Sequence, residues 1–156
     1  MKNGKSIQLN KQSGSGFTLV ELMITVSILG ILSVVALPNL MRARSNANDQ
    51  AVKEDLKAFV QAVESYRTGQ GIPVYPGAIA DLTVAIPPYL DASWSADTVT
   101  RHGHVLTYLS GESEFSMTAQ QITGQSLLSY CIDSSGVIYA DATTTGNLCS
   151  GTAINS

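Results

Sequence analysis

The sequence is poor in the side chains that carry most enzyme and metal chemistry. Its 156 residues include two cysteines, two histidines and one tryptophan, and only 13% of the residues are charged. Neither cysteine has a second ligand at the two-residue spacing of zinc sites. The chain also has no G-x-S-x-G elbow, no phosphate-binding glycine loop and no paired catalytic carboxylates. We therefore expect no enzymatic activity, no cofactor and no metal site.

The chain also lacks an excess of positive charge. It has 9 basic and 12 acidic residues, for a formal net charge of −3. Lys2, Lys5 and Lys11 all precede Gly16, so the balance after Gly16 is −3 − 3 = −6. A nucleic-acid-binding surface needs basic side chains that neutralise phosphates. We predict no specific nucleic-acid partner.

One long apolar run dominates the N-terminal part of the chain. The 21 residues from Phe17 to Leu37 contain a single charged side chain, Glu21, which is the fifth residue of the run. As a helix, the run is about 31 Å long and matches a bilayer core of about 30 Å. A carboxylate inside that core costs about 2.5–3.5 kcal/mol on insertion scales. Glu21 therefore needs a partner, or a position near the interface from which it reaches water.

Residues 1–16, MKNGKSIQLNKQSGSG, are polar and basic and have no periodic apolar face. We interpret them as a leader that ends at the small residue Gly16 and is removed from the mature chain. A conventional signal peptide is the alternative, but its apolar core has about 7–15 residues and is shorter than this run. The leader lysines place it in the cytoplasm and the C-terminal part outside. Arg42 and Arg44, which follow the run, weaken this charge asymmetry.

The predicted helix continues well beyond the apolar run. Gly30 and Pro38 interrupt strong helix formers, and we expect a kink or a flexible point near Pro38 because proline removes a backbone hydrogen bond. From residue 39 the apolar side chains recur at three- and four-residue steps, which predicts one buried face. Glycines and prolines from Gly69 onward end the pattern. The sequence predicts one helix of about fifty residues.

The C-terminal part predicts a small antiparallel sheet. Residues 70–104 carry four prolines and are typical of an irregular connection with one helical turn. Strand-like runs follow at 105–109, 114–121, 127–132 and 136–140, separated by short turns that join antiparallel neighbours. The predicted fold class is α+β, with a long N-terminal helix packed against this sheet, which spans residues 105–140.

These patterns divide the chain into four predicted parts. They are a leader (1–16), a transmembrane helix (17–38), the amphipathic second half of the same helix (39–69) and a globular head (70–156). The large side chains are concentrated in the apolar run, so the head has a small core and would gain from a covalent cross-link.

Cys131 and Cys149 are the candidates for that cross-link. In an exported head they form a disulfide that bounds the loop 131–149 and holds the C-terminal tail, whereas in the cytosol they are two free buried thiols. His102 and His104 lie two residues apart in RHGHV, and no further ligand lies nearby. We interpret both as exposed loop histidines.

Residues 16–44, GFTLVELMITVSILGILSVVALPNLMRAR, closely resemble the start of type IV prepilins and of the related pseudopilins of secretion systems. The resemblance combines a basic leader ending in Gly16, aromatic Phe17, Glu21 as fifth residue of the mature chain, and Gly30 and Pro38. It covers about a fifth of the chain, and the remainder is similar only in layout. The late cysteine pair resembles the disulfide-bounded loop of many type IV pilins, which favours a pilin over a major pseudopilin.

The resemblance implies processing followed by assembly. A prepilin peptidase would cut between Gly16 and Phe17 and methylate the new amine of Phe17. That amine would supply a positive charge for Glu21 of a neighbouring subunit, and such a pair is stronger inside a packed helical bundle than at a surface. Gly30 and Pro38 would let the helix unwind and extend in the filament; the alternative is a static proline kink.

We accordingly expect a structural subunit that polymerises into a type IV pilus for adhesion, twitching motility or DNA uptake. Its partners would be further copies of itself in a helical homopolymer, prepilin peptidase, the inner-membrane pilus assembly machinery and, before assembly, the membrane. The precursor would lie in the inner membrane with a periplasmic head, and the assembled subunit in an extracellular pilus. The alternatives are a type II secretion pseudopilin, a minor pilin that primes assembly and, from another class, a membrane-anchored periplasmic binding module.

Overall fold

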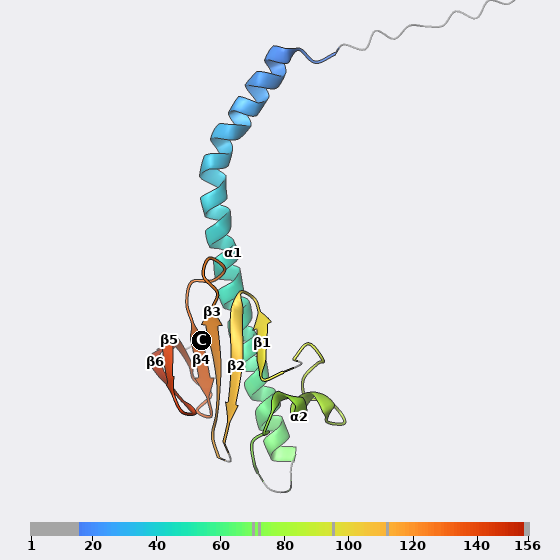
Figure 1. Cartoon of the computed structure of the whole chain (residues 1–156), viewed down its shortest axis with the longest axis vertical. Helices are drawn as coiled ribbons and strands as arrows, with labels where there is room; N and C mark the ends of the chain where they lie inside the picture. The colour runs from blue at the N-terminus through green and yellow to red at the C-terminus, as the bar shows by residue number, and fades with distance from the viewer. Residues whose placement is uncertain (1–15, 70, 72, 95, 112, 155–156) are drawn as a thin grey trace, which may run out of the picture. The chain divides into compact units, whose positions relative to one another are not determined.

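A computed structural model of the chain describes residues 16–69, 71, 73–94, 96–111 and 113–154 (Figure 1). Its elements are two helices and six strands: α1 (Leu19–Gly69), α2 (Ile79–Val84), β1 (Thr98–Arg101), β2 (His104–Ser110), β3 (Phe115–Gln121), β4 (Tyr130–Asp133), β5 (Ile138–Thr145) and β6 (Leu148–Ile154). The α+β fold class predicted from the sequence is confirmed. The chain divides into two compact units, residues 1–39 and residues 40–156.

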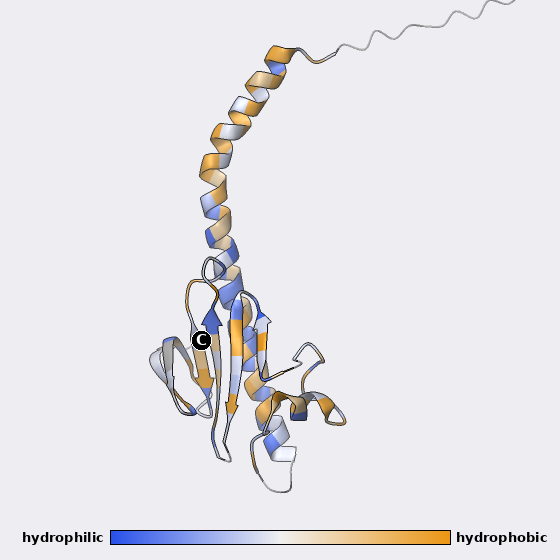
Figure 2. Cartoon of the chain, viewed as in Figure 1, coloured by the Kyte–Doolittle hydropathy of each residue, from blue (hydrophilic) through white to orange (hydrophobic). Residues whose placement is uncertain are grey.

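Helix α1 has 51 residues, in agreement with the sequence prediction of about fifty. Its two halves differ in composition: hydrophobic residues dominate the first, and polar and apolar residues alternate in the second (Figure 2). Pro38 lies inside the helix and does not interrupt it. The first half belongs to one compact unit and most of the second half to the other.

The second unit is built on one face of α1. Val52, Leu56, Phe59 and Val63 recur at three- and four-residue steps, and each is completely buried. This spacing places all four side chains on a single stripe of the helix. The stripe packs against inward-facing residues of the sheet, as the sequence predicts.

An aromatic cluster forms the centre of that core. The Phe59 ring lies 5.6 Å from the Trp94 ring, 5.3 Å from the Tyr108 ring and 6.2 Å from the Phe115 ring, measured between centroids. The Tyr108 hydroxyl donates a 2.7 Å hydrogen bond to the Pro76 carbonyl. The proline-rich connection is thereby tied to the sheet, because a buried phenol needs a partner for its hydroxyl.

The six strands form one antiparallel sheet in the order β1-β2-β3-β4-β5-β6, so every strand pairs with its neighbour in sequence. The four predicted strands are present, but β4 begins three residues later than predicted and β5 ends five residues later. Residues 127 and 128 do not pair in the ladder, because the Leu127 N–H donates to the Asp49 carboxylate and the Leu128 carbonyl oxygen lies 2.9 Å from the His104 ring, so β4 begins only at Tyr130.

Two strands were missing from the sequence prediction. Strand β1 lies within the segment predicted to be irregular, and β6 lies within the predicted tail. Strand β6 contains Gly151 and has mostly small or polar side chains, so intrinsic strand preference is weak there. Pairing with β5 and a covalent link, rather than local sequence, hold β6 in the sheet.

The end of the sheet folds back over its own face. Cys131 of β4 and Cys149 of β6 form a disulfide with Cα atoms 5.8 Å apart, although β5 lies between these strands in the ladder. Neighbouring strands are about 4.8 Å apart, so strands two places apart in a flat sheet would be about 9.6 Å apart. The register irregularity between Ala140 and Thr143 of β5 provides the bend.

Candidate assembly segment and disulfide-bounded loop

A capping box begins helix α1. The Thr18 hydroxyl accepts a 3.2 Å hydrogen bond from the Glu21 N–H, and one Glu21 carboxylate oxygen accepts hydrogen bonds from the Thr18 N–H (2.9 Å) and the Thr18 hydroxyl (2.7 Å). This reciprocal pattern satisfies backbone donors that a helix start leaves unpaired. The single charged side chain of the apolar run is thus held at the helix N-terminus, where the helix dipole also favours an anion.

Gly16 and Phe17 precede this cap as exposed residues outside the helix. The Phe17 side chain is 86% exposed. A Cβ atom added to Gly16 would meet no atom within 4 Å. The predicted cleavage position therefore lies in open backbone beside Thr18 and Glu21. The rest of the predicted leader, residues 1–15, lies outside the described residues.

The apolar side chains of the first half of α1 have no cover in the described part of the chain. Each of the large ones is at least 52% exposed: Leu19, Val20, Leu22, Met23, Ile24, Val26, Ile28, Leu29, Ile31, Leu32, Val34, Val35 and Leu37. By length and composition, α1 is the one helix in the described residues that qualifies as a candidate membrane span. An uncovered apolar surface of this size needs an apolar environment from outside the subunit.

The hydroxyl groups within this segment bond back to the helix itself. Thr25 donates to the Glu21 carbonyl at 2.6 Å, Ser27 to the Met23 carbonyl at 2.7 Å, and Ser33 to the Leu29 carbonyl at 2.7 Å. In lipid or in a protein bundle every polar group must find an internal partner. These hydroxyls therefore do not oppose transfer of the segment into an apolar environment.

Gly30 and Pro38 have no packing role within the subunit itself. A Cβ atom added at Gly30 would meet nothing within 4 Å. Pro38 has no N–H to donate to the preceding turn, and next to it the Asn39 side chain donates to the Val35 carbonyl at 3.2 Å. The reason for a glycine at position 30 must be sought in helix flexibility or in the approach of another molecule.

In the head, Asp133 organises the disulfide-bounded loop. One carboxylate oxygen accepts hydrogen bonds from the N–H (2.9 Å) and the hydroxyl (2.6 Å) of Ser135, and the other accepts from the N–H of Cys149 at 2.9 Å. Burial raises the pKa of the Asp133 carboxyl, but these hydrogen bonds outweigh it and hold the pKa below its ordinary value. The carboxylate thus joins the turn after β4 to the start of β6.

The interpretation of His104 as an exposed loop residue is wrong. His104 is fully buried at the start of β2, with its Nδ1 3.0 Å from the His102 carbonyl oxygen and its Nε2 2.9 Å from the Leu128 carbonyl oxygen. The Asp49 carboxylate of α1 lies 3.7 Å from Nε2. Position 104 faces inward because β2 alternates, and these partners make its burial acceptable. Within the described residues, no three His, Cys, Asp or Glu side chains form a group that could hold a metal ion.

Comparison with known proteins addresses the N-terminal segment. The profile of the prokaryotic N-terminal methylation motif matches residues 11–37. The chain is 39% identical over 59 residues to the type II secretion system core protein G of Klebsiella michiganensis, covering 38% of this chain and 42% of that protein. It is 43% identical over 56 residues to the type IV wide pilus major component PilA4 of Thermus thermophilus, covering 36% and 43%. It is also 43% identical over 51 residues to the type IV major pilin PilA of Myxococcus xanthus, covering 33% and 23%.

The chain carries the N-terminal segment of the prepilin and pseudopilin family. The match spans less than half of the length of each of these relatives. No solved structure matched the chain significantly. The similarity to this family therefore concerns the start of the chain, and the head is described from its structure alone.

Sequence reasoning missed the role of Thr18 in this prepilin-type segment. It treated Glu21 as a carboxylate without a partner in its own subunit, whereas Thr18 supplies two donors to it. The signal was available, because a threonine three residues before a glutamate at the start of an apolar run is a capping box. Asp133 was missed as an organiser of the cysteine loop, since a DSSG sequence predicts only a turn.

Proposed function

We propose that this chain is a structural subunit that is processed as a prepilin and polymerises into a type IV pilus. The observation that carries the proposal is the first half of α1, where every large apolar side chain is more than half exposed and one carboxylate sits at the helix start. In the precursor, lipid would cover these side chains. In the filament, the same residues of neighbouring subunits would cover them.

Cleavage between Gly16 and Phe17 would connect these two states. It removes three lysines and creates an amine on Phe17, and methylation leaves that amine positively charged. The amine and Glu21 of a neighbouring subunit would form an ion pair in a medium where water no longer screens it. Breaking such a buried pair by removing one partner leaves an uncompensated charge, which is strongly destabilising.

The Thr18–Glu21 hydrogen bonds give this step a defined starting state. Before assembly, the carboxylate is compensated within its own subunit by Thr18. The precursor would therefore tolerate Glu21 near the interface of the inner membrane, with its leader in the cytoplasm and its head in the periplasm. The filament has to offer Glu21 a stronger partner than Thr18, and a methylated amine meets that requirement because its hydrogen bond is charge-assisted on both sides.

The experiment replaces Glu21 with valine and measures filaments sheared from cells. Glu21→Val should leave membrane insertion unchanged and reduce filament yield to background. The matched control is Glu54→Val, which removes an exposed carboxylate from the second half of the same helix. Filament yield that is unchanged in Glu21→Val would contradict assembly through this residue. N-terminal sequencing of the mature protein should begin at Phe17, and any other start would contradict the processing site.

A type II secretion pseudopilin is the second candidate, because several relatives carry that name. The disulfide-bounded loop of the head favours the pilin. Mass spectrometry of sheared surface filaments separates the two functions. A pilin should be the main protein of long filaments, whereas a pseudopilin should be missing from the sheared fraction while its loss blocks protein secretion.

A further inference from the structure

Two arginines, Arg42 and Arg44, follow within seven residues of the end of the apolar run, and the proposed assembly mechanism does not use them. Arg42 and Arg44 come immediately after Met41, and both are exposed. Within the described residues neither makes an ion pair, whereas the two later arginines of the chain each have a carboxylate partner. Membrane proteins usually concentrate basic residues on the cytoplasmic side. In the proposed topology these arginines lie on the opposite side, so a specific anionic partner would account for them.

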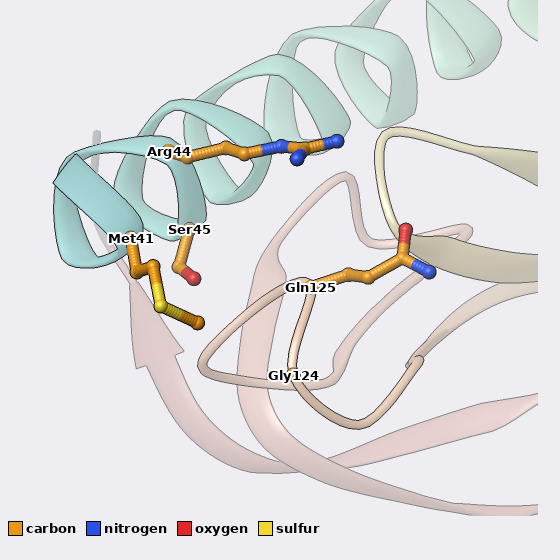
Figure 3. Close-up of a pocket in the computed structure, with 5 residues that line it drawn as sticks. All are labelled: Met41, Arg44, Ser45, Gly124 and Gln125. Carbon is orange, nitrogen blue, oxygen red and sulfur yellow. The ribbon is translucent and has the colours of Figure 1, made fainter. Parts of the chain in front are cut away.

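One of the two arginines lines a pocket. The pocket has a volume of about 260 Å³ and is formed by Met41, Arg44 and Ser45 of α1 with Gly124 and Gln125 of the loop between β3 and β4. Figure 3 shows Met41 and Ser45 pointing from the helix toward the loop that carries Gly124. The Arg44 and Gln125 side chains extend in a common direction from the helix and from that loop.

The loop wall of this pocket is fixed by hydrogen bonds to α1. The Asn48 amide donates to the Gln125 carbonyl at 2.6 Å, and the Leu127 N–H donates to the buried Asp49 carboxylate at 3.3 Å. Gly103 supports the same loop, because a Cβ atom there would lie 2.8 Å from the Gln125 Cβ. The Gln125 backbone is therefore held in place before any ligand arrives.

The lining combines hydrogen-bond donors with one apolar side chain and no carboxylate. A guanidinium, a hydroxyl and a carboxamide can all donate to the oxygens of a phosphate group, and arginine presents its donors in a planar fork that matches that geometry. Met41 offers a contact for the less polar part of a ligand. The set suits a phosphate anion attached to an apolar group.

We propose that this pocket binds the phosphate of an anionic phospholipid headgroup while the subunit waits in the membrane. The inference rests on the proposed function, since Arg44 comes seven residues after the apolar run ends at Leu37. Free inorganic phosphate shares the same chemistry and is the second possible source. Lipid binding would keep this pocket at the bilayer surface until the subunit is extracted into a filament.

The test measures lipid retention by the unassembled full-length chain in detergent. Phosphatidylglycerol and phosphatidylcholine with identical acyl chains are added separately, and native mass spectrometry gives the bound fraction for each. The wild type should prefer phosphatidylglycerol, because the choline cation of phosphatidylcholine is repelled by a guanidinium bound to the phosphate. Arg44→Gln should reduce that preference about ten-fold, which is the loss expected when a charged hydrogen-bond donor to the phosphate is removed. Arg42→Gln and Lys57→Gln remove the same charge from exposed positions outside the pocket and should change the preference by less than about two-fold.

Other outcomes of this experiment distinguish lipid phosphate from free phosphate as the ligand, or contradict phosphate binding in this pocket. Inorganic phosphate that binds alone and displaces phosphatidylglycerol, both sensitive to Arg44→Gln, would support the phosphate site and assign it to free phosphate. Equal retention of the two lipids by the wild type, or equal losses in Arg42→Gln and Arg44→Gln, would overturn it. If Arg44→Gln lowers filament yield but leaves the lipid preference unchanged, the lipid proposal is wrong. The partner of Arg44 would then be a carboxylate on a neighbouring subunit. Because the assay uses unassembled chains, a failure of polymerisation would leave its result intact.

Discussion

The two halves of helix α1 are continuous in backbone but opposite in burial. In the second half, Val52, Leu56, Phe59 and Val63 are completely buried by the chain's own sheet. In the first half, no large apolar side chain is less than 52% exposed. The difference lies in pattern rather than in helix propensity. A one-sided stripe can be covered by a single sheet, whereas a helix that is apolar all round needs cover from every side.

The contrast shows which part of the fold is complete in the monomer. The second unit satisfies its apolar residues internally and needs no neighbour for its core. The first half of α1 is not covered by the described part of the chain, and its apolar side chains need an apolar environment from outside it. Substitutions should therefore have local effects in the head and collective effects in the first half.

The largest effect on the stability of the head is expected from Phe59→Ala. This change removes the ring that contacts Trp94, Tyr108 and Phe115, and a cavity of that kind costs about 3–5 kcal/mol. Urea unfolding of the detergent-solubilised chain measures the loss, followed by fluorescence of Trp94, the one tryptophan of the chain. Ile28→Ala in the first half should leave this transition within about 0.5 kcal/mol of the wild type. Equal losses in both variants would contradict the division of the helix into a self-sufficient half and a dependent half.

Loss of the disulfide should have the next largest effect on the stability of the head. It tests whether β6 is held in the sheet by the disulfide or by strand pairing alone. Strand β6 is joined to β4 by a bridge that spans 18 residues of sequence, and closing such a loop contributes about 3 kcal/mol in the chain-entropy view. The double variant Cys131→Ser/Cys149→Ser should lower the free energy of unfolding of the head by about 2–4 kcal/mol. Reductant should lower the wild type to the level of the double variant and should not affect the variant. A loss below about 1 kcal/mol would mean that the ladder alone holds β6.

Sequence patterns predicted the parts of the fold that depend on local periodicity. The helix length follows from the spacing of its apolar residues, and β2 and β3 follow from alternation bounded by turn signals. The edge strand β6 could not be predicted, because its support comes from β5 and from a bond to Cys131. Strand β1 has only four residues, of which the first three are β-branched, and so short a run is a weak signal.

The candidate sites likewise could be predicted only where their residues are close together in the sequence. Phe17 and Glu21 could be proposed from the sequence alone, because the motif is continuous along the chain. The burial of His104 depends on Asp49 and Leu128, which are far away in sequence. No local pattern places three such residues together. The pocket beside Arg44 likewise requires the loop at Gln125 to return to the helix.

Replacement of Asp133 should have a smaller effect on the stability of the head, and this effect should depend on pH. Like Glu21, it is a carboxylate held by a neighbouring hydroxyl residue, but it is buried within the head. Asp133→Asn loses the acceptor for the Cys149 N–H and should cost roughly 1–3 kcal/mol at neutral pH in urea unfolding. Glu114→Gln, an exposed carboxylate outside this network, is the control and should change little.

The pH profile of the same unfolding experiment tests the charge of Asp133. Its folded-state pKa is lowered, so its contribution is fully present above the unfolded pKa of about 3.9 and is lost as the pH falls through the folded value. The wild type should therefore lose stability in this acid range more steeply than Asp133→Asn. Parallel profiles for the two proteins would show that the hydrogen bonds to Asp133 do not depend on its ionisation.

The smallest effect, and the one most specific to the first half of α1, is expected at Gly30. Alanine at this position meets no atom of the subunit and favours the helix by roughly 0.8–1 kcal/mol, so the unfolding of the head should be unchanged. If Gly30 serves to let the helix unwind in the filament, Gly30→Ala should reduce the unwound population about five-fold and shorten the extension of single filaments under force. Ala36→Gly makes the reverse change six residues, about 1.7 turns, away and should lengthen that extension, and the double variant should return toward the wild type. Extension that is the same in the wild type and in all three variants would contradict a role of Gly30 in flexibility, because helix propensity at positions 30 and 36 would then have no influence on unwinding.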